Sequence, residues 1–409
     1  MKWDSHLHSA ETIISQYEGQ IPLAAFLKDF FRHNPRMGAA DRKSISAMVY
    51  GFYRLGHALG KASRTERILA GLFLCSGEKS PALDYLDPEW GSRTGAPFAE
   101  KIGLVASRAG SFSMEEVFPW KDALSQGMDP SGFSRSLLRQ PRMFIRIRDG
   151  MHARVLGALT RAGVPLERLG SDCVALPAAT KTDQILTDRS WYQVQDYSSQ
   201  RTADFFQPDL LPLEGGALVW DCCAGSGGKS IMFHDLRPEA DLWVSDSRAT
   251  IIRNLRSRFR EAGITRYRSS IIDLTAPGPL HFPERRADAL IADVPCTGSG
   301  TWARTPEQLY FFHPGRIQQM RQRQLEICRR VIPHLKPGGS LVYITCSVFA
   351  GENEQVVEEI CSRHGMELRA REILAGHELG ADTLFAALLT GVDHLGHQGL
   401  GPQGDPDKI

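Results

Sequence analysis

The chain has 409 residues, a length that predicts two or three domains, and its 48 basic and 47 acidic side chains leave a net charge of +1. This balance excludes a globally basic protein, so any contact with RNA has to use a local basic surface. The eight cysteines include no CxxC pair and are few for a chain of this length, which argues against a zinc site and a disulfide framework. The polar start and the lack of a long apolar run predict a cytoplasmic protein with no membrane span.

The first 130 residues have the apolar periodicity of helices. In residues 41–55, DRKSISAMVYGFYRL, apolar side chains recur at i, i+3, i+4, i+7 and i+8, and an aspartate can cap the start. Apolar stretches at 22–31 and 67–74 continue this character, whereas the Pro- and Gly-containing residues 80–97 predict a loop. We therefore expect an all-α domain over residues 1–130.

The pattern changes to mixed strands and helices after that domain. FIRIR alternates like a strand, residues 153–162 have helical character, and DCVALP is a second short strand, which predicts a small α+β module over residues 131–190. From Gly215 onward apolar strands alternate with helices, which predicts a parallel sheet in a Rossmann-like α/β domain over residues 191–393. Residues 394–409 are expected to form a flexible tail.

A glycine turn, DCCAGSGGKS, follows the apolar strand at 217–220. A phosphate loop would need glycine at the position of Cys223. The motif therefore fits a nucleoside-binding site, formed by a strand, a glycine turn and a helix, better than it fits a phosphate loop. Asp246 ends the next strand, close to the roughly 20-residue spacing of an acid that binds ribose hydroxyls. These features predict an S-adenosylmethionine site, with Asp246, Arg248, Asp273 and Asp293 beside the turn. The turn itself comprises Cys223, Ala224, Gly225, Ser226, Gly227, Gly228 and Lys229.

Two charged residues near this site have more than one interpretation. Asp273 follows a third predicted strand, where it can meet the adenine amine or be a solvated loop acid. Lys229 can be a charge at a helix start or a group that faces the pocket.

Two cysteines follow the ends of the fourth and fifth predicted strands of this domain. Cys296 lies in DVPCTGSGTWARTPE and Cys346 in TCSVFAGENEQVVEEI, at the edge where open α/β sheets bind ligands. A cysteine at this edge is suited to the methylation of cytosine, because carbon 5 of that base becomes nucleophilic only after a thiolate adds at carbon 6. Asp293 can bind the edge of the base. The residues alone do not rank the two thiols.

These motifs resemble the RsmB/Sun-type RNA (cytosine-5)-methyltransferase family. The resemblance rests on DCCAGSGGKS, VSDSR with Arg248, DVPCTGSGTWARTPE, TCS followed by GENEQ, and VQDYSSQ. It implies that Cys346 is the nucleophile, that Cys296 assists product release, and that ribosomal RNA is the substrate of a chain with a NusB-like RNA-binding domain at its amino terminus. Two positions depart from the family pattern: Ser226 replaces a common proline, and Ala303 replaces a basic residue.

Several side chains can contact RNA, although each also has a structural explanation. Trp302 can stack on a base or pack in its loop. Arginines that can bind phosphate or form solvated helix faces are Arg253, Arg256, Arg258, Arg260, Arg316, Arg321, Arg323, Arg329 and Arg330. The competing functions are a methyltransferase for a protein or small molecule, which gives two pocket cysteines no purpose, and a non-catalytic RNA-binding assembly protein.

Overall fold

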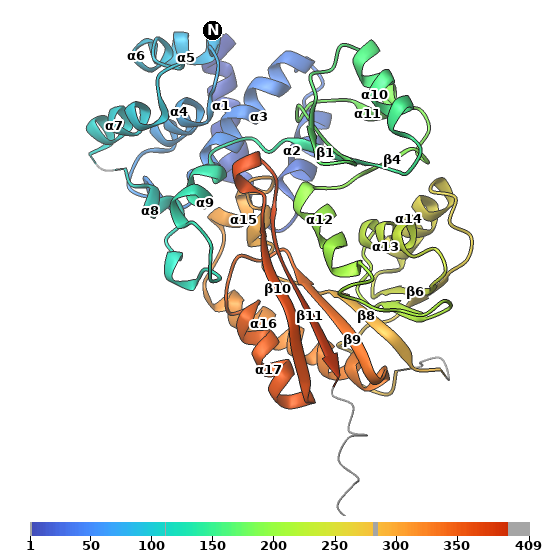
Figure 1. Cartoon of the computed structure of the whole chain (residues 1–409). Coiled ribbons are helices and arrows are strands. Elements are labelled where there is room, and N and C mark those ends of the chain that lie inside the picture. Colours follow the sequence, from blue (N-terminus) through green and yellow to red (C-terminus); the bar gives the residue numbers. More distant parts are fainter. Residues whose placement is uncertain (1, 111, 281–284, 392–409) are drawn as a thin grey trace, which may run out of the picture.

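The computed structural model of the protein describes residues 2–110, 112–280 and 285–391, and the predicted tail therefore lies outside the described residues. Figure 1 shows three parts: a group of amino-terminal helices, a small module with strands β1 and β4, and a large sheet with helices along it. None of the helices in these described ranges is long and apolar enough to cross a membrane.

The amino-terminal part is all-α, as the periodicity predicts. Residues 41–54 belong to α3, and their apolar positions Ile45, Met48, Val49, Phe52 and Tyr53 are buried. The carboxylate of Asp41 accepts the backbone N–H of Gly38 and so caps the start of this helix. The helices are α1 (Lys2–Gln16), α2 (Leu23–His33), α3 (Ala39–Arg54), α4 (Arg64–Cys75), α7 (Phe98–Ala109), α8 (Met114–Val117) and α9 (Pro130–Leu137), with a short 3-10 helix η1 (Lys121–Ala123).

The loop predicted for residues 80–97 is wrong, because this segment contains two short helices, α5 (Pro81–Leu86) and α6 (Pro88–Gly91). Both begin with proline, which the first turn of a helix tolerates because its N–H would have no partner there. The side chains of Ser80 and Asp87 accept backbone N–H groups and cap the two helices. The prolines therefore start helices in this segment.

The small module has a four-stranded antiparallel sheet in the order β2-β3-β1-β4. Its elements are β1 (Met143–Ile147), α10 (His152–Arg161), β2 (Glu167–Leu169), β3 (Cys173–Leu176), α11 (Thr182–Ile185) and β4 (Tyr192–Val194). The two predicted strands and the predicted helix are present. Strands β2 and β4 were not predicted, because three residues are too few to show an alternating pattern. Strand β4 lies beyond residue 190 and pairs with β1, and the division of the chain into domains stays a prediction.

The large sheet has seven strands in the order β10-β11-β9-β8-β5-β6-β7. The strands β5 to β9 pair in parallel, as predicted, but β10 and β11 add an antiparallel hairpin beside β9 that the sequence did not predict. The strands are β5 (Leu218–Asp221), β6 (Asp241–Asp246), β7 (Arg268–Ile271), β8 (Ala287–Asp293), β9 (Leu335–Thr345), β10 (Met366–Ala375) and β11 (Thr383–Gly391). This is the predicted Rossmann-like α/β architecture.

Alternating strand residues fill two cores, one on each face of this sheet. Val219 packs with helices α13 (Gly228–Leu236) and α14 (Ala249–Glu261) and with the 3-10 helix η2 (Thr202–Phe206) on one face. Its neighbour Trp220 packs with α16 (Gly315–Val331) and α17 (Glu354–His364) on the other. Because both faces are covered, ligands reach the parallel strands at their carboxyl ends.

The amino-terminal helices share one hydrophobic core with the loops that follow β8 and β9. Trp302, Leu309, Phe312, Val348 and Phe349 are buried in the same cluster as residues of α1 to α4, and helix α15 (Pro306–Tyr310) packs against α3. The helical part is therefore continuous with the loops that carry the two cysteines.

A buried arginine and a short backbone pairing reinforce this junction. The guanidinium of Arg54 donates to the carbonyl oxygens of Leu137, Arg139 and Ala303. Residue Leu124 forms a β-bridge with Phe349, three residues after Cys346. Both contacts hold the amino-terminal part against the cysteine loops.

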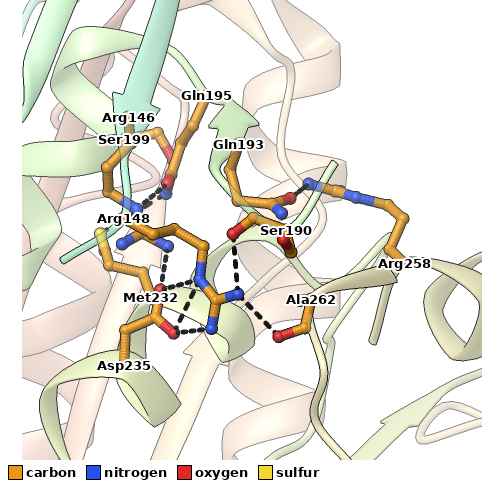
Figure 2. A network of polar contacts seen from close by, with 10 residues as sticks. All are labelled: Arg146, Arg148, Ser190, Gln193, Gln195, Ser199, Met232, Asp235, Arg258 and Ala262. Atoms are coloured by element: carbon orange, nitrogen blue, oxygen red, sulfur yellow. Dashed lines mark hydrogen bonds and ion pairs between the residues drawn. The ribbon is translucent and has the colours of Figure 1, made fainter. Parts of the chain in front are cut away.

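The small module is bound to the α/β domain by a network of arginines (Figure 2). Arg146 and Arg148 of the module converge on Asp235 in α13, and Arg148 also donates to the carbonyl oxygen of Ala262 at 2.6 Å. Arg258 of α14 donates to Gln193 in β4 at 2.8 Å. The module is thereby fixed beside the helices that follow the glycine turn.

Candidate active site

The predicted glycine turn lies between the carboxyl end of β5 and the start of α13. Gly225 and Gly227 have φ of +54° and +82°, which only glycine adopts without strain. Open space lies where a side chain of Gly225 would project, whereas a side chain at Gly227 would meet Phe259 at 2.8 Å. The turn thus presents bare backbone beside a helix amino terminus, as a nucleoside site requires.

Asp246 lies at the end of β6 and faces this turn. Its carboxylate accepts the backbone N–H of Gly225 at 3.2 Å and three N–H groups of Arg248. Burial alone would raise the pKa of Asp246, but the hydrogen bonds from Arg248 outweigh burial and lower it. The carboxylate is therefore ionised and held beside the glycine turn.

Arg258, one of the arginines considered for phosphate binding, instead supports this turn. It donates to the carbonyl oxygen and the hydroxyl of Ser226 at 3.0 and 2.8 Å. The hydroxyl of Ser226 thus accepts a hydrogen bond that the side chain of a proline, common at this position in the family, could not accept. Since Arg258 also contacts Gln193, it links the small module to the turn.

Asp273 lies two residues after β7 and is exposed. Its carboxylate accepts the backbone N–H and the hydroxyl of Thr275 at 2.8 and 2.7 Å, which lowers the pKa of Asp273. These bonds stabilise the local turn, and contact with adenine stays a prediction.

Asp293, at the end of β8, pairs with Lys229 of α13 at 2.7 Å. Burial alone would lower the pKa of Lys229, but the charge of Asp293 outweighs it and raises the pKa, and Cys346 adds to this effect. Lys229 therefore faces the site as a cation. The second carboxylate oxygen of Asp293 has no hydrogen-bond partner among the described residues, so it is available to a ligand.

The two cysteines meet beyond the carboxyl ends of β8 and β9. The sulfur atoms of Cys296 and Cys346 are 3.2 Å apart, and both residues are partly exposed. Hydrogen bonding to Cys346, together with burial, raises the pKa of the Cys296 thiol well above its ordinary value. Cys296 is therefore a protonated thiol that can donate to the sulfur of Cys346.

A fully buried carboxylate, Glu352, holds the loops of the two cysteines together. It accepts the backbone N–H and the hydroxyl of Thr297, the hydroxyl of Ser347 and the amide of Gln324, at 2.6 to 3.0 Å. Thr297 and Ser347 each directly follow a cysteine. Glu352 is the first glutamate of the GENEQ motif, and its position shortly after TCS is the one sequence feature that indicates this role.

Trp302 packs in its loop and does not face solvent. It is 1% exposed and its ring lies 4.8 Å from that of Phe312 and 5.9 Å from that of Phe349. The stacking role considered for it is therefore wrong, because the core of the amino-terminal helices covers the ring. Arg304 forms ion pairs with Asp196 and Asp382, so it too binds protein.

The remaining arginines divide into paired and unpaired groups. Arg321 forms an ion pair with Glu359 of α17, and Arg329 forms one with Glu326 of its own helix α16. Arg330 donates to two backbone carbonyl oxygens. The exposed side chains without an ion pair among the described residues are Arg253, Arg256, Arg260, Arg316 and Arg323. Of the arginines named in the sequence analysis, these five stay free to contact phosphate.

Comparison with known proteins agrees with this geometry. The sequence model of the 16S rRNA methyltransferase RsmB/F family matches residues 209–389. A ribosomal RNA small subunit methyltransferase B of Photorhabdus laumondii is 27% identical over 232 residues, which are 55% of this chain and 52% of that protein. The chain thus spans about half the length of this curated relative.

Solved structures show the same fold. The crystal structure of PH0851 has a TM-score of 0.65 and 19% identity, and the match covers 90% of this chain and 94% of that one. The structure of NSun6 from Pyrococcus horikoshii with SFG has a TM-score of 0.55 and 14% identity, covering 68% of this chain and 96% of that one.

The parallel sheet with its glycine turn and acidic strand ends is the fold of a class I methyltransferase domain. Residues 209–389 match the sequence model of the RsmB/F methyltransferase family. The resemblance predicted from the sequence motifs is thereby confirmed for this part of the chain. The amino-terminal region is helical, and its NusB-like character stays a prediction.

Proposed function

We propose that the protein methylates carbon 5 of a cytosine in RNA, with S-adenosylmethionine as methyl donor and a cysteine adduct at carbon 6 as intermediate. The observation that supports this most directly is the pair of thiols, Cys296 and Cys346, 3.2 Å apart and next to Asp293. A methyltransferase for a protein or small molecule has no use for such a pair. A non-catalytic RNA-binding protein has no use for it either.

The residues around the glycine turn fit the donor. The exposed backbone of Gly225 can accommodate the cofactor, and the ionised carboxylate of Asp246 can accept hydrogen bonds from ribose hydroxyls. Arg248 would share this carboxylate with the ribose, and Asp273 would lie near the adenine. When bound, S-adenosylmethionine supplies an electrophilic methyl group.

In the proposed mechanism the thiolate of Cys346 adds to carbon 6 of the cytosine. Lys229 lies within electrostatic reach of Cys346, and a nearby cation stabilises a thiolate. The free carboxylate oxygen of Asp293 can accept a hydrogen bond from the amino edge of the base and orient it. The addition makes carbon 5 an enamine-like nucleophile, which forms the bond to the methyl group.

Cys296 has the second role, in release. Once carbon 5 carries the methyl group, a base takes its proton. The electron pair of that C–H bond forms the double bond between carbons 5 and 6 as the bond between carbon 6 and the sulfur of Cys346 breaks. Cys296, adjacent to that sulfur, is placed to assist this elimination and to return Cys346 as a thiolate. The assignment of the two roles follows the family resemblance and the raised pKa of the Cys296 thiol.

Ribosomal RNA is the proposed substrate, because the P. laumondii relative carries the name of a ribosomal RNA methyltransferase. The cytoplasm is the corresponding compartment. The test is to incubate the protein with methyl-labelled S-adenosylmethionine and small-subunit ribosomal RNA or transfer RNA, and to identify the modified nucleoside by mass spectrometry. We expect 5-methylcytosine in ribosomal RNA. Label in another base, or in protein, would contradict the proposal.

A further inference from the structure

A second cavity lies where the amino-terminal helices meet α15, and none of the residues assigned to methyl transfer lines it. Its volume is about 590 Å³. Its walls come from α1, α3, α4, the segment 56–62 and the end of α15. The cavity therefore joins the helical part of the chain to the segment that follows the Cys296 loop.

Aromatic rings form much of the wall. The ring of Tyr53 lies 5.7 Å from that of Tyr17 and 5.3 Å from that of Tyr310. Phe311 contacts Tyr17 at a ring distance of 5.8 Å and is itself 44% exposed. An exposed ring that is supported by buried rings is a platform on which a base can stack.

The charged groups of the wall are cationic. Arg64 is exposed and has no carboxylate partner among the described residues. Arg67 is only 4% exposed, and its guanidinium lies 4.7 Å from the ring of Phe52 and 5.1 Å from that of Tyr310. No aspartate or glutamate is among the lining residues. The cavity therefore favours an aromatic ligand that carries negative charge.

A buried nitrogen of this wall has no partner in the part of the chain that the structure describes. The Nη atoms of Arg67 donate to the carbonyl oxygens of Gly56 and Ala58, but its Nε has no acceptor among the described residues. A buried donor of a charged group without an acceptor is costly. A ligand or water oxygen in the cavity would relieve that cost.

We propose that this cavity binds one nucleotide of the RNA, with its base stacked on the exposed ring of Phe311 and its phosphate at Arg64. The inference rests on the proposed function in taking RNA as the ligand. Since Tyr310 and Phe311 follow the Cys296 loop along the chain, a nucleotide held there would position the RNA relative to the two thiols.

The test uses the full chain carrying Cys346→Ala, so that no covalent adduct forms. Single-stranded oligoribonucleotides of about 12 residues containing 4-thiouridine are cross-linked by light, and the attached peptide is identified by mass spectrometry. We expect the cross-link on the peptide with Tyr310 and Phe311. Cross-links confined to other surfaces, or no RNA binding at all, would overturn the proposal.

Affinity measurements supply the second readout. Phe311→Ala should weaken RNA binding about 5- to 150-fold, while Phe311→Leu, which keeps apolar bulk without a stacking ring, should also bind weakly. Arg64→Ala should reduce the slope of log affinity against log salt by about 0.7. Tyr85→Ala and Arg36→Ala are matched controls outside the cavity, and we expect both to bind RNA like the parent.

Methyl transfer is measured separately in the protein with Cys346 intact, so that the two proposals can fail independently. If this protein methylates RNA but Phe311→Ala and Arg64→Ala bind like the parent, the cavity proposal is wrong and the proposed function stands. If RNA cross-links in the cavity but no cytosine is methylated, the proposed function fails and the cavity proposal stands.

Discussion

The sulfur atoms of Cys296 and Cys346 are 3.2 Å apart although the two residues are 50 positions apart in the chain. The parallel pairing of β8 with β9 brings their following loops to the same edge of the sheet. Glu352 then fixes both loops through the residues that follow the cysteines. The distance between the thiols thus depends on a carboxylate that touches neither of them.

The first prediction concerns Glu352. Replacing it with alanine removes the acceptor of four hydrogen bonds from the two cysteine loops and Gln324, and a buried donor left unsatisfied costs about 1–3 kcal/mol, so the two loops should shift relative to each other. We expect methyl transfer to fall at least tenfold, with affinity for S-adenosylmethionine nearly unchanged, as measured by initial rates and calorimetry. Glu358→Ala, on the exposed side of α17, is the control. Equal rates in the two variants would show that Glu352 does not position the thiols.

The second prediction concerns the methyl donor. Asp246→Ala removes the carboxylate proposed to bind the ribose, so S-adenosylmethionine should bind about 5- to 150-fold more weakly, corresponding to about 1–3 kcal/mol for a charge-assisted hydrogen bond. Calorimetry measures this change directly. Asp241→Ala, at the opposite end of the same strand, should bind the donor normally. Micromolar ATP binding without S-adenosylmethionine binding would instead favour a phosphate loop.

The third prediction concerns the pH dependence of stability. Burial raises the pKa of Asp221 to about 7, whereas an unfolded aspartate has a pKa near 4, so the folded state holds a proton that the unfolded state releases between these values. Stability should therefore fall by about 1.4 kcal/mol per pH unit from this group as pH rises from about 4 to 7, and level off above. Asp221→Asn should lose that contribution in denaturant unfolding, while exposed Asp209→Asn should keep it. Parallel profiles for wild type and Asp221→Asn would mean that Asp221 is already ionised in the folded state.

The fourth prediction concerns the junction with the amino-terminal helices. Arg54→Met removes the buried donor of three backbone carbonyl oxygens, which should lower the free energy of unfolding by about 2–3 kcal/mol. Lys43→Met, on the exposed face of the same helix, should change it by less than about 0.5 kcal/mol. Thermal unfolding of both variants measures the difference. A loss no larger than that of the control would indicate a junction held by apolar packing alone.

Sequence patterns predicted β5, β6 and β8 well, because each is a short, mainly apolar run that ends at an aspartate. They failed at β10 and β11, because β10 has mostly polar side chains at its exposed positions, although Gly365 ends helix α17 directly before it. They also failed at residues 80–97, where the prolines were interpreted as loop residues but occupy the first positions of two short helices.

The candidate site shows the same division. Residues at strand ends, such as Asp246 and Asp293, could be predicted, because the topology of a parallel sheet brings strand ends together. Contacts between distant segments could not. Arg54 binding the carbonyl oxygen of Ala303 and the packing of Trp302 in the helical core depend on how the amino-terminal part docks, which no local pattern encodes.

The measurement that tests the account most directly is the identity of the cysteine bonded to RNA. Wild type, Cys296→Ala and Cys346→Ala are incubated with substrate RNA and S-adenosylmethionine, resolved on a denaturing gel, and the linked peptide is sequenced by mass spectrometry. We expect Cys296→Ala to accumulate a methylated RNA bonded to Cys346, and Cys346→Ala to form neither adduct nor product, because carbon 5 is then never activated. An adduct on Cys296 in the Cys346→Ala variant would reverse the roles, and methylation intact in both variants would contradict covalent catalysis by this pair.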